Sequence, residues 1–171
     1  VIQADILKFN VNNIMPLGKK LKVLSNLPYN ISTQVIFKLL ESPGLFSELC
    51  LMLQKEVAER IVAQPGTKDY GILSVIAQIH SEPKILLQVG PEAFRPRPKV
   101  DSALVRFRIS DIKSQISDRF QISDYQVFKK VVKACFGQRR KMIINSLAGS
   151  GLKLKKEKIA QLLARAGISP Q

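Results

Sequence analysis

The sequence predicts an α/β fold, an open sheet with packed helices, followed by a small all-helical domain. Short apolar runs bounded by turn residues alternate with amphipathic helical stretches over residues 1–110. A polar stretch from Ser110 to Ser123 then changes the composition, and only helical periodicity follows it. We therefore predict two domains, 1–110 and 111–171.

Length and composition agree with this division. The chain has 171 residues, 46% of them hydrophobic, which is enough for one good core and a smaller satellite domain. No stretch approaches the roughly 20 apolar residues of a membrane span. Cys50 and Cys135 lie in apolar runs without metal-ligand spacing, so we expect buried reduced thiols in a cytosolic protein and no metal site.

The first elements are short strands and one helix. Val1–Ala4 and Leu21–Ser25 are apolar runs that predict buried parallel strands. Ser32 or Thr33 is expected to cap the next helix. The apolar side chains of this helix share one face: Val35, Ile36, Leu39 and Leu40.

Four further segments complete the expected sheet and its helices. Glu48–Leu53 is a predicted strand, and residues 55–63 form a helix with Glu56 and Arg60 paired on its outer side. Ile72–Ile79 is interpreted as a buried helix, although periodicity alone also allows a strand. Lys84–Val89 is a strand.

The last part of the first domain is a proline-rich passage and one alternating strand. Pro91 to Pro98 cannot form a central strand or a helix interior. Ala103–Ile109 alternates apolar and charged residues and predicts an antiparallel strand, with a sheet edge as one option.

Beyond the boundary, three helices are expected. Asp124 caps the first, whose apolar residues lie on one side. Gly137 interrupts it, and a second helix is expected from Arg139 to Leu147. The third ends before Gly167.

Asn26-Leu27-Pro28-Tyr29 is the first motif that carries chemistry. It follows a predicted strand, and in open α/β sheets ligands bind at the carboxyl ends of strands. An amide oxygen and a backbone carbonyl accept hydrogen bonds from an exocyclic amine, and the Tyr ring stacks on a base. The four residues alone fit an ordinary proline turn equally well. The helix that follows favours a site for chemistry on a nucleobase amine.

The segment from Phe94 to Ser102 contains alternating prolines that hold an extended backbone. Phe94 could form a second wall opposite Tyr29, while the basic side chains could contact phosphates: Arg95, Arg97 and Lys99. Taken alone, the segment favours a rigid connector with solvated charges.

The second domain is strongly basic. Residues 111–171 hold 13 Lys/Arg and 4 Asp/Glu, against 14 and 9 in residues 1–110. The cluster Arg139-Arg140-Lys141 is expected to open a helix, where the dipole adds to an anion site. A polyanion is the natural partner, and nucleic acid fits better than an anionic membrane because the helices lack a Trp/Phe-rich face.

Asp5 and His80 are two further residues whose side chains could have a function. Asp5 follows the first predicted strand, where its carboxylate could accept a nucleotide amine or simply start a turn. His80 is the only histidine and has no ligand pattern around it, so a structural role is expected.

The chain resembles the rRNA adenine N6-dimethyltransferase family, most closely its bacterial small-subunit branch. Five motifs carry the resemblance in order, over essentially the whole chain: Asn26–Ser32, Leu53–Val57, Tyr70–Val75, Phe94–Ser102 and Phe136–Leu147.

The resemblance implies a Rossmann-like class I methyltransferase sheet and S-adenosylmethionine-dependent dimethylation of two adjacent adenosines in 16S rRNA. It implies that Asp5 and Asn26 contact the cofactor and that Asn26 and the Leu27 carbonyl hold the target N6. Tyr29 and Phe94 would sandwich the flipped base. The expected protein is a cytoplasmic monomer that binds the small-subunit precursor.

One departure stands out. The family's glycine-rich cofactor loop is expected upstream of Asp5, and no such run occurs in this sequence. The chain therefore resembles a fragment lacking the N-terminal part of the sheet, and we expect it to bind cofactor weakly when isolated. Two alternatives stay open: a 23S rRNA methyltransferase of the macrolide-resistance type, and a non-catalytic RNA-binding assembly factor.

Overall fold

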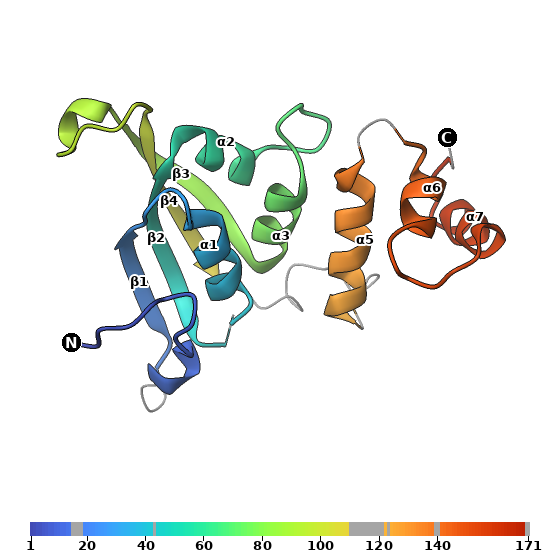
Figure 1. Ribbon diagram of the computed structural model, residues 1–171, viewed down its shortest axis with the longest axis horizontal. Coiled ribbons are helices and arrows are strands. Elements are labelled where there is room, and N and C mark those ends of the chain that lie inside the picture. Colours follow the sequence, from blue (N-terminus) through green and yellow to red (C-terminus); the bar gives the residue numbers. More distant parts are fainter. Residues whose placement is uncertain (15–18, 43, 110–121, 123, 139–140, 170–171) are drawn as a thin grey trace. The chain divides into compact units, whose positions relative to one another are not determined.

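The computed structural model describes residues 1–14, 19–42, 44–109, 122, 124–138 and 141–169. The chain divides into two compact units, Val1–Arg119 and Phe120–Gln171, which we call the first and the second unit (Figure 1). The domain boundary predicted after residue 110 lies outside the described residues. Among the described helices, none is long and apolar enough to cross a membrane.

The first unit contains a mixed four-stranded sheet in the order β1-β2-β4-β3. Its strands are β1 (Leu21–Asn26), β2 (Phe46–Gln54), β3 (Ser81–Val89) and β4 (Ser102–Ile109). β1 and β2 are parallel, whereas β4 is antiparallel to both of its neighbours, β2 and β3. The strands predicted over Leu21–Ser25 and Glu48–Leu53 are confirmed.

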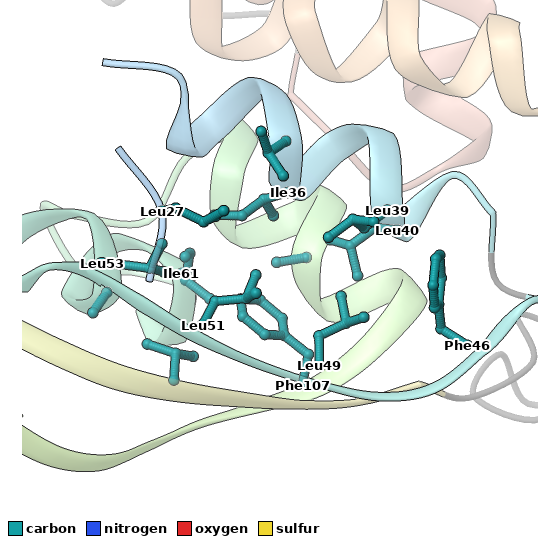
Figure 2. Packing of buried hydrophobic residues seen from close by; sticks show 14 of the residues in the cluster. Leu27, Ile36, Leu39, Leu40, Phe46, Leu49, Leu51, Leu53, Ile61 and Phe107 are labelled. Carbon is teal, nitrogen blue, oxygen red and sulfur yellow. The ribbon is translucent and has the colours of Figure 1, made fainter. Parts of the chain in front are cut away.

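Three helices pack against one face of this sheet: α1 (Ser32–Leu40), α2 (Lys55–Val62) and α3 (Ile72–His80). The inward side chains of β2 and β4 interlock with them, and Phe107 is fully buried at the centre (Figure 2). Two short 3₁₀ helices, η1 (Val11–Ile14) and η2 (Pro91–Ala93), lie in the connections. The helices predicted over residues 55–63 and 72–79 are confirmed, and Glu56 pairs with Arg60.

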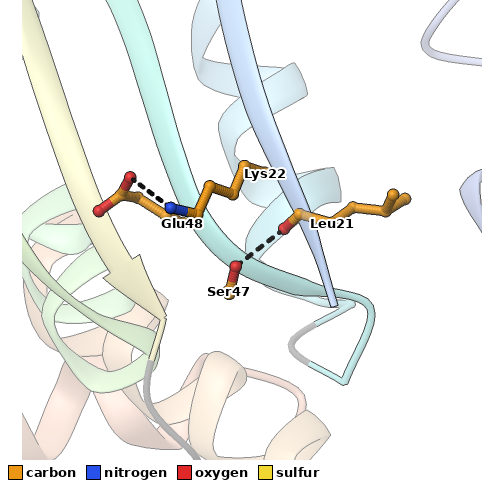
Figure 3. Close-up of polar contacts among 4 residues, drawn as sticks. All are labelled: Leu21, Lys22, Ser47 and Glu48. Atoms are coloured by element: carbon orange, nitrogen blue, oxygen red, sulfur yellow. Dashed lines mark hydrogen bonds and ion pairs between the residues drawn. The ribbon is translucent and has the colours of Figure 1, made fainter. Parts of the chain in front are cut away.

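Side-chain contacts, in addition to backbone hydrogen bonds, hold the first residues of β1 and β2 together. The Ser47 hydroxyl donates to the Leu21 carbonyl at 3.2 Å, and Lys22 approaches Glu48 at 4.0 Å (Figure 3). The Lys22 side chain is largely exposed, so this ion pair contributes little. The hydrogen bond lies where the register between the two strands shifts, between Leu21 and Lys22.

Two predictions, the strand at Val1–Ala4 and the N-cap of α1, are wrong. Val1–Ala4 forms no strand, and its side chains are exposed. An apolar run predicts burial only where a neighbouring strand can pair with it, and no described strand pairs with this one. The N-cap of α1 is Ile31, and buried Ser32 instead donates its hydroxyl to the Tyr29 carbonyl at 3.0 Å.

The edge position considered for Ala103–Ile109 is also wrong, although its antiparallel pairing is confirmed. β4 lies between β2 and β3, where Arg108 is flanked by Glu48 and Glu82. Cross-strand carboxylates let a strand with charged residues occupy an inner position. β3 ends the sheet instead, and an edge strand tolerates Pro83. β3 therefore extends through Pro83 and begins at Ser81, three residues before the predicted Lys84.

The second unit contains three described helices: α5 (Tyr125–Gly137), α6 (Ile143–Ala148) and α7 (Lys156–Arg165). The predicted cap is confirmed, since the Asp124 carboxylate accepts from the N–H groups of Gln126 and Val127. The helix expected from Arg139 begins only at Ile143. Lys141 precedes it, and α6 is too short to support an anion site at its N-terminus.

Both cysteines are half-buried rather than fully buried. Partial burial raises the pKa of the Cys135 thiol, because an apolar environment disfavours the thiolate. The sole histidine, His80, is buried at the end of α3, in keeping with a structural role.

Candidate functional site

Sheet topology brings two of the sequence motifs together. β2 is parallel to β1 and antiparallel to β4, so the carboxyl end of β1 and the amino end of β4 lie at one edge of the sheet. Through the ladder, Asn26 is paired with Met52, and Ser102 with Gln54 two residues further along β2. The segments that leave β1 and enter β4 are therefore neighbours.

These two segments line one pocket of about 300 Å³. The end of β1 and the turn after it contribute Asn26, Leu27, Pro28 and Tyr29, and the chain before β4 contributes Phe94, Arg95, Pro96 and Pro98. The structure thus brings all five predicted catalytic residues to a single cavity. It places the aromatic residues of both motifs in the lining, as a base-binding slot requires.

The first wall is fixed by its backbone. The Leu27 side chain is buried, and its N–H donates to the Met52 carbonyl at 3.4 Å. The Ile31 N–H donates to the Pro28 carbonyl at 3.2 Å, and Ser32 holds the Tyr29 carbonyl. Asn26 remains exposed at the sheet edge. The turn is therefore rigid, and its amide is accessible to a ligand.

The Tyr29 phenol is anchored away from its own segment. Its oxygen lies 2.6 Å from the hydroxyl oxygen of Ser102, the first residue of β4. Ser102 is fully buried. A phenol held in this way offers its ring face rather than its hydroxyl as the free recognition surface. Ser102 is a functional candidate that the sequence motifs alone did not indicate.

The second wall is tied to the end of β2. Phe94 is half-buried and follows η2, and its N–H donates to the Pro91 carbonyl at 3.3 Å. The Lys55 N–H donates to the Asp101 carbonyl at 2.9 Å, while the two side chains approach at 3.8 Å. The backbone bond is the stronger constraint, because the ion pair is partly exposed.

The predicted phosphate-binding residues of this segment are all exposed. Arg95 lines the pocket itself. Lys99 lines an adjacent pocket of about 390 Å³, together with Lys55, Glu56, Glu59 and Asp101. Arg97 lies between Arg95 and Lys99 in the sequence and is exposed. Arg95 is therefore the one of these cations that lines the pocket itself.

The remaining predicted site residues are Asp5 and the cluster Arg139-Arg140-Lys141. Asp5 is not among the described residues that line the pocket; its Oδ1 accepts the Leu7 N–H at 2.9 Å. Lys141 is exposed in the second unit, and Arg139 and Arg140 lie outside the described residues. The structure thus shows Asp5 in the local turn that the sequence analysis considered.

Comparison with known proteins decides the family. The family model for ribosomal RNA adenine dimethylase matches residues 1–168. The chain belongs to this family. The resemblance inferred from the five motifs is thereby confirmed.

Relatives of the dimethylase family match nearly the whole chain. The "Ribosomal RNA small subunit methyltransferase A" of Geobacter metallireducens is 44% identical over 99% of the chain, which spans 61% of that relative. The protein of the same name from Syntrophotalea carbinolica is 48% identical over 87% of the chain, which spans 54% of it. The chain thus spans little more than half the length of these relatives.

Two solved structures share the fold at 24% identity. A dimethyladenosine transferase from Plasmodium falciparum matches 99% of the chain and 57% of its own length, with a TM-score of 0.70. The 23S rRNA methyltransferase ErmE matches 99% of the chain and 63% of its own length, with a TM-score of 0.61. The mixed α/β sheet is therefore that of methyltransferase structures.

Proposed function

We propose that the chain is the base-binding part of an S-adenosylmethionine-dependent rRNA adenine N6,N6-dimethyltransferase. The substrate would be two adjacent adenosines near the 3′ end of 16S rRNA, modified during small-subunit biogenesis in the cytoplasm. Family membership and the names of the relatives support this activity. The observation that carries it is the pocket shared by Asn26–Tyr29 and Phe94–Pro98.

The pocket suits one extruded base. Its volume of about 300 Å³ is at the small end of the range for ligand sites. A base must leave its stack before its amino group can react, and aromatic side chains compensate for the lost stacking. In this proposal Tyr29 and Phe94 contact the two faces of the adenine.

Acceptors at the sheet edge would orient the reacting nitrogen. The lone pair of an adenine N6 is delocalised into the ring. Hydrogen bonds from N6–H to the Asn26 amide oxygen and the Leu27 carbonyl favour a more tetrahedral, nucleophilic nitrogen. Rate acceleration then comes from positioning and electrostatics and requires no strong base.

S-adenosylmethionine supplies an electrophilic methyl group on a sulfonium. The described residues fit part of such a cofactor: Asn26 presents an exposed amide at the strand end. Asp5 uses Oδ1 for the Leu7 N–H, and a carboxylate has a second oxygen that can accept an adenine amine. We propose these two residues as cofactor contacts within a Rossmann-like class I sheet.

Basic residues would hold the RNA backbone. Arg95 borders the pocket, and Arg97 and Lys99 are exposed close by in sequence. The second unit adds Lys141 and the neighbouring Arg139 and Arg140. Arg is suited to bidentate phosphate contacts, and this binding is expected to be salt-dependent.

The test is methyl transfer by a chimaera. The chain replaces the matching region of the Geobacter metallireducens relative, and incorporation of labelled methyl groups is measured on small subunits that lack dimethyladenosine. Asn26→Ala should reduce turnover roughly 100- to 1,000-fold because it removes an oriented hydrogen-bonding group. Asn13→Ala, an exposed asparagine in η1, is the matched control.

The proposal is wrong if a folded chimaera carrying Asn26→Ala retains full turnover. Large subunits and naked 23S rRNA are assayed in parallel. Methylation of those substrates alone would instead identify an enzyme of the macrolide-resistance type. Tight RNA binding without turnover in the unsubstituted chimaera would indicate an assembly factor.

A further inference from the structure

A side-chain hydrogen bond joins Tyr29, in the first wall, to Ser102, at the end of the segment that forms the second wall. Tyr29 and Ser102 are 73 positions apart in the chain, and their hydroxyl oxygens are 2.6 Å apart. Ser102 is fully buried, and its backbone is paired with Gln54 on β2 and Val89 on β3. The serine hydroxyl is therefore a fixed point of the inner sheet.

Tyr29, in contrast, lies in the turn after β1 and is half-buried. A tyrosine ring can rotate about two side-chain torsions. A hydrogen bond at the phenol oxygen, the atom furthest from the backbone, restricts the swing of the whole ring. Either hydroxyl can donate in this pair, so the restriction requires no particular protonation pattern.

The ring that is restricted in this way lines the pocket together with Phe94. Ser102 also ends the segment that carries Phe94 and follows Asp101, whose carbonyl accepts the Lys55 N–H. Ser102 thus contacts Tyr29 of the first wall directly and is the residue at which the segment of the second wall ends. Stacking depends on the distance and angle between rings, so a hydrogen bond that restricts the Tyr29 ring should affect base binding.

We propose that Ser102 is a positioning residue that fixes the Tyr29 ring in the orientation required to stack on the extruded base. This inference rests on the proposed function of the pocket. It assigns Ser102 no contact with substrate and no part in methyl transfer itself.

The first test uses the chain itself and an RNA oligonucleotide with 2-aminopurine at an unpaired position. Stacking of this adenine analogue quenches its fluorescence. Ser102→Ala and Tyr29→Phe remove the same hydrogen bond from opposite sides and keep the ring. Each should weaken the quenching affinity roughly 3- to 10-fold, the range of one hydrogen bond.

The double variant decides whether the two hydroxyls act together. If they do, Ser102→Ala combined with Tyr29→Phe should be no weaker than either single variant. Multiplying losses would overturn the proposal, as would an unchanged affinity in Ser102→Ala. Ser81→Ala is the matched control, because Ser81 is equally buried, begins β3 and donates a 2.7 Å hydrogen bond to the Ala77 carbonyl.

A second measurement separates ring positioning from loss of fold. Tyrosine-labelled protein should show one dominant χ1 rotamer for Tyr29 in NMR scalar couplings, and Ser102→Ala should average several rotamers while its melting temperature stays above the assay temperature. Phenylalanine labelling of Tyr29→Phe should show the same averaging at position 29. Tyr29→Phe leaves no buried cavity at Ser102, so it remains informative if Ser102→Ala is unstable.

The two hypotheses fail differently. If the unsubstituted chain does not quench 2-aminopurine, and the same oligonucleotide with adenosine at that position binds no more tightly than one with an abasic site there, the base-binding function fails and the inference fails with it. If the unsubstituted chain quenches and Tyr29→Ala abolishes quenching while Ser102→Ala retains it, only the role of Ser102 is wrong.

Discussion

The two units differ in how much apolar surface they bury. The described part of the first unit contains one cluster of 17 buried hydrophobic residues spanning the sheet and three helices. The corresponding cluster in the second unit has three, Leu147, Ile159 and Leu163, with partly buried neighbours. A core this small gives a domain little stability of its own.

The second unit, which has the smaller core, carries the larger excess of positive charge. The described residues of the second unit hold 9 Lys/Arg and 2 Asp/Glu, and those of the first hold 14 and 9. We infer that the two units contribute differently to RNA binding. A large core holds a pocket in which fractions of an ångström matter, whereas a thin core suffices to display cations whose attraction is long-ranged and tolerant of geometry.

The largest expected effect is loss of the main core. Phe107→Ala removes a fully buried ring packed between the sheet and the helices, so the first unit should lose about 3–5 kcal/mol of unfolding free energy. Urea denaturation followed by NMR signals of each unit measures this. Phe136→Ala, at a side chain 36% exposed on α5, is the matched control. Equal losses in the two variants would contradict the comparison.

A smaller loss of free energy is expected in the second unit. Ile159→Ala should cost about 2–4 kcal/mol, because Ile159 is 2% exposed at the centre of the three-helix cluster. We expect α5, α6 and α7 to unfold while 2-aminopurine quenching persists. Leu162→Ala, 43% exposed on the same helix, is the control. Simultaneous loss of quenching would show that the units do not fold independently.

Local periodicity predicted most of the elements in both units. β1, β2 and α2 have clear apolar patterns that fix their strand or helical state, whereas the continuous apolar run of α3 allowed either state and was interpreted correctly as a helix. The cap at Asp124 was equally predictable, because a carboxylate before an apolar helix satisfies the first N–H groups whatever the tertiary structure.

Features that depend on distant partners were not predictable. Val1–Ala4 has the composition of a strand but no described pairing partner, and β4 is an inner strand although Arg106 and Arg108 alternate with its apolar residues. The pocket lining followed from motif chemistry and topology. Ser102 did not, because a serine at the start of a strand has no local signal for a phenol 73 residues away.

The smallest expected effect concerns salt. Lys130 and Lys133 are exposed on α5, and if each neutralises one phosphate, converting both to Gln should reduce the salt slope of RNA binding by about 1.4 for single strands. Binding titrations between 50 and 200 mM salt measure this slope.

The same lysines converted to Arg keep the charge and should keep the slope. Tyr29→Ala provides the contrast, because it removes a stacking surface and no charge: affinity should fall while the slope stays unchanged. If the Gln variants leave the salt slope unchanged, or if Tyr29→Ala reduces it, the proposed separation is wrong. The second unit would not supply the electrostatic part of RNA affinity while the first supplies the stacking part. The first unit would then have to supply the phosphate contacts, with Arg95, Arg97 and Lys99 as the residues to replace next.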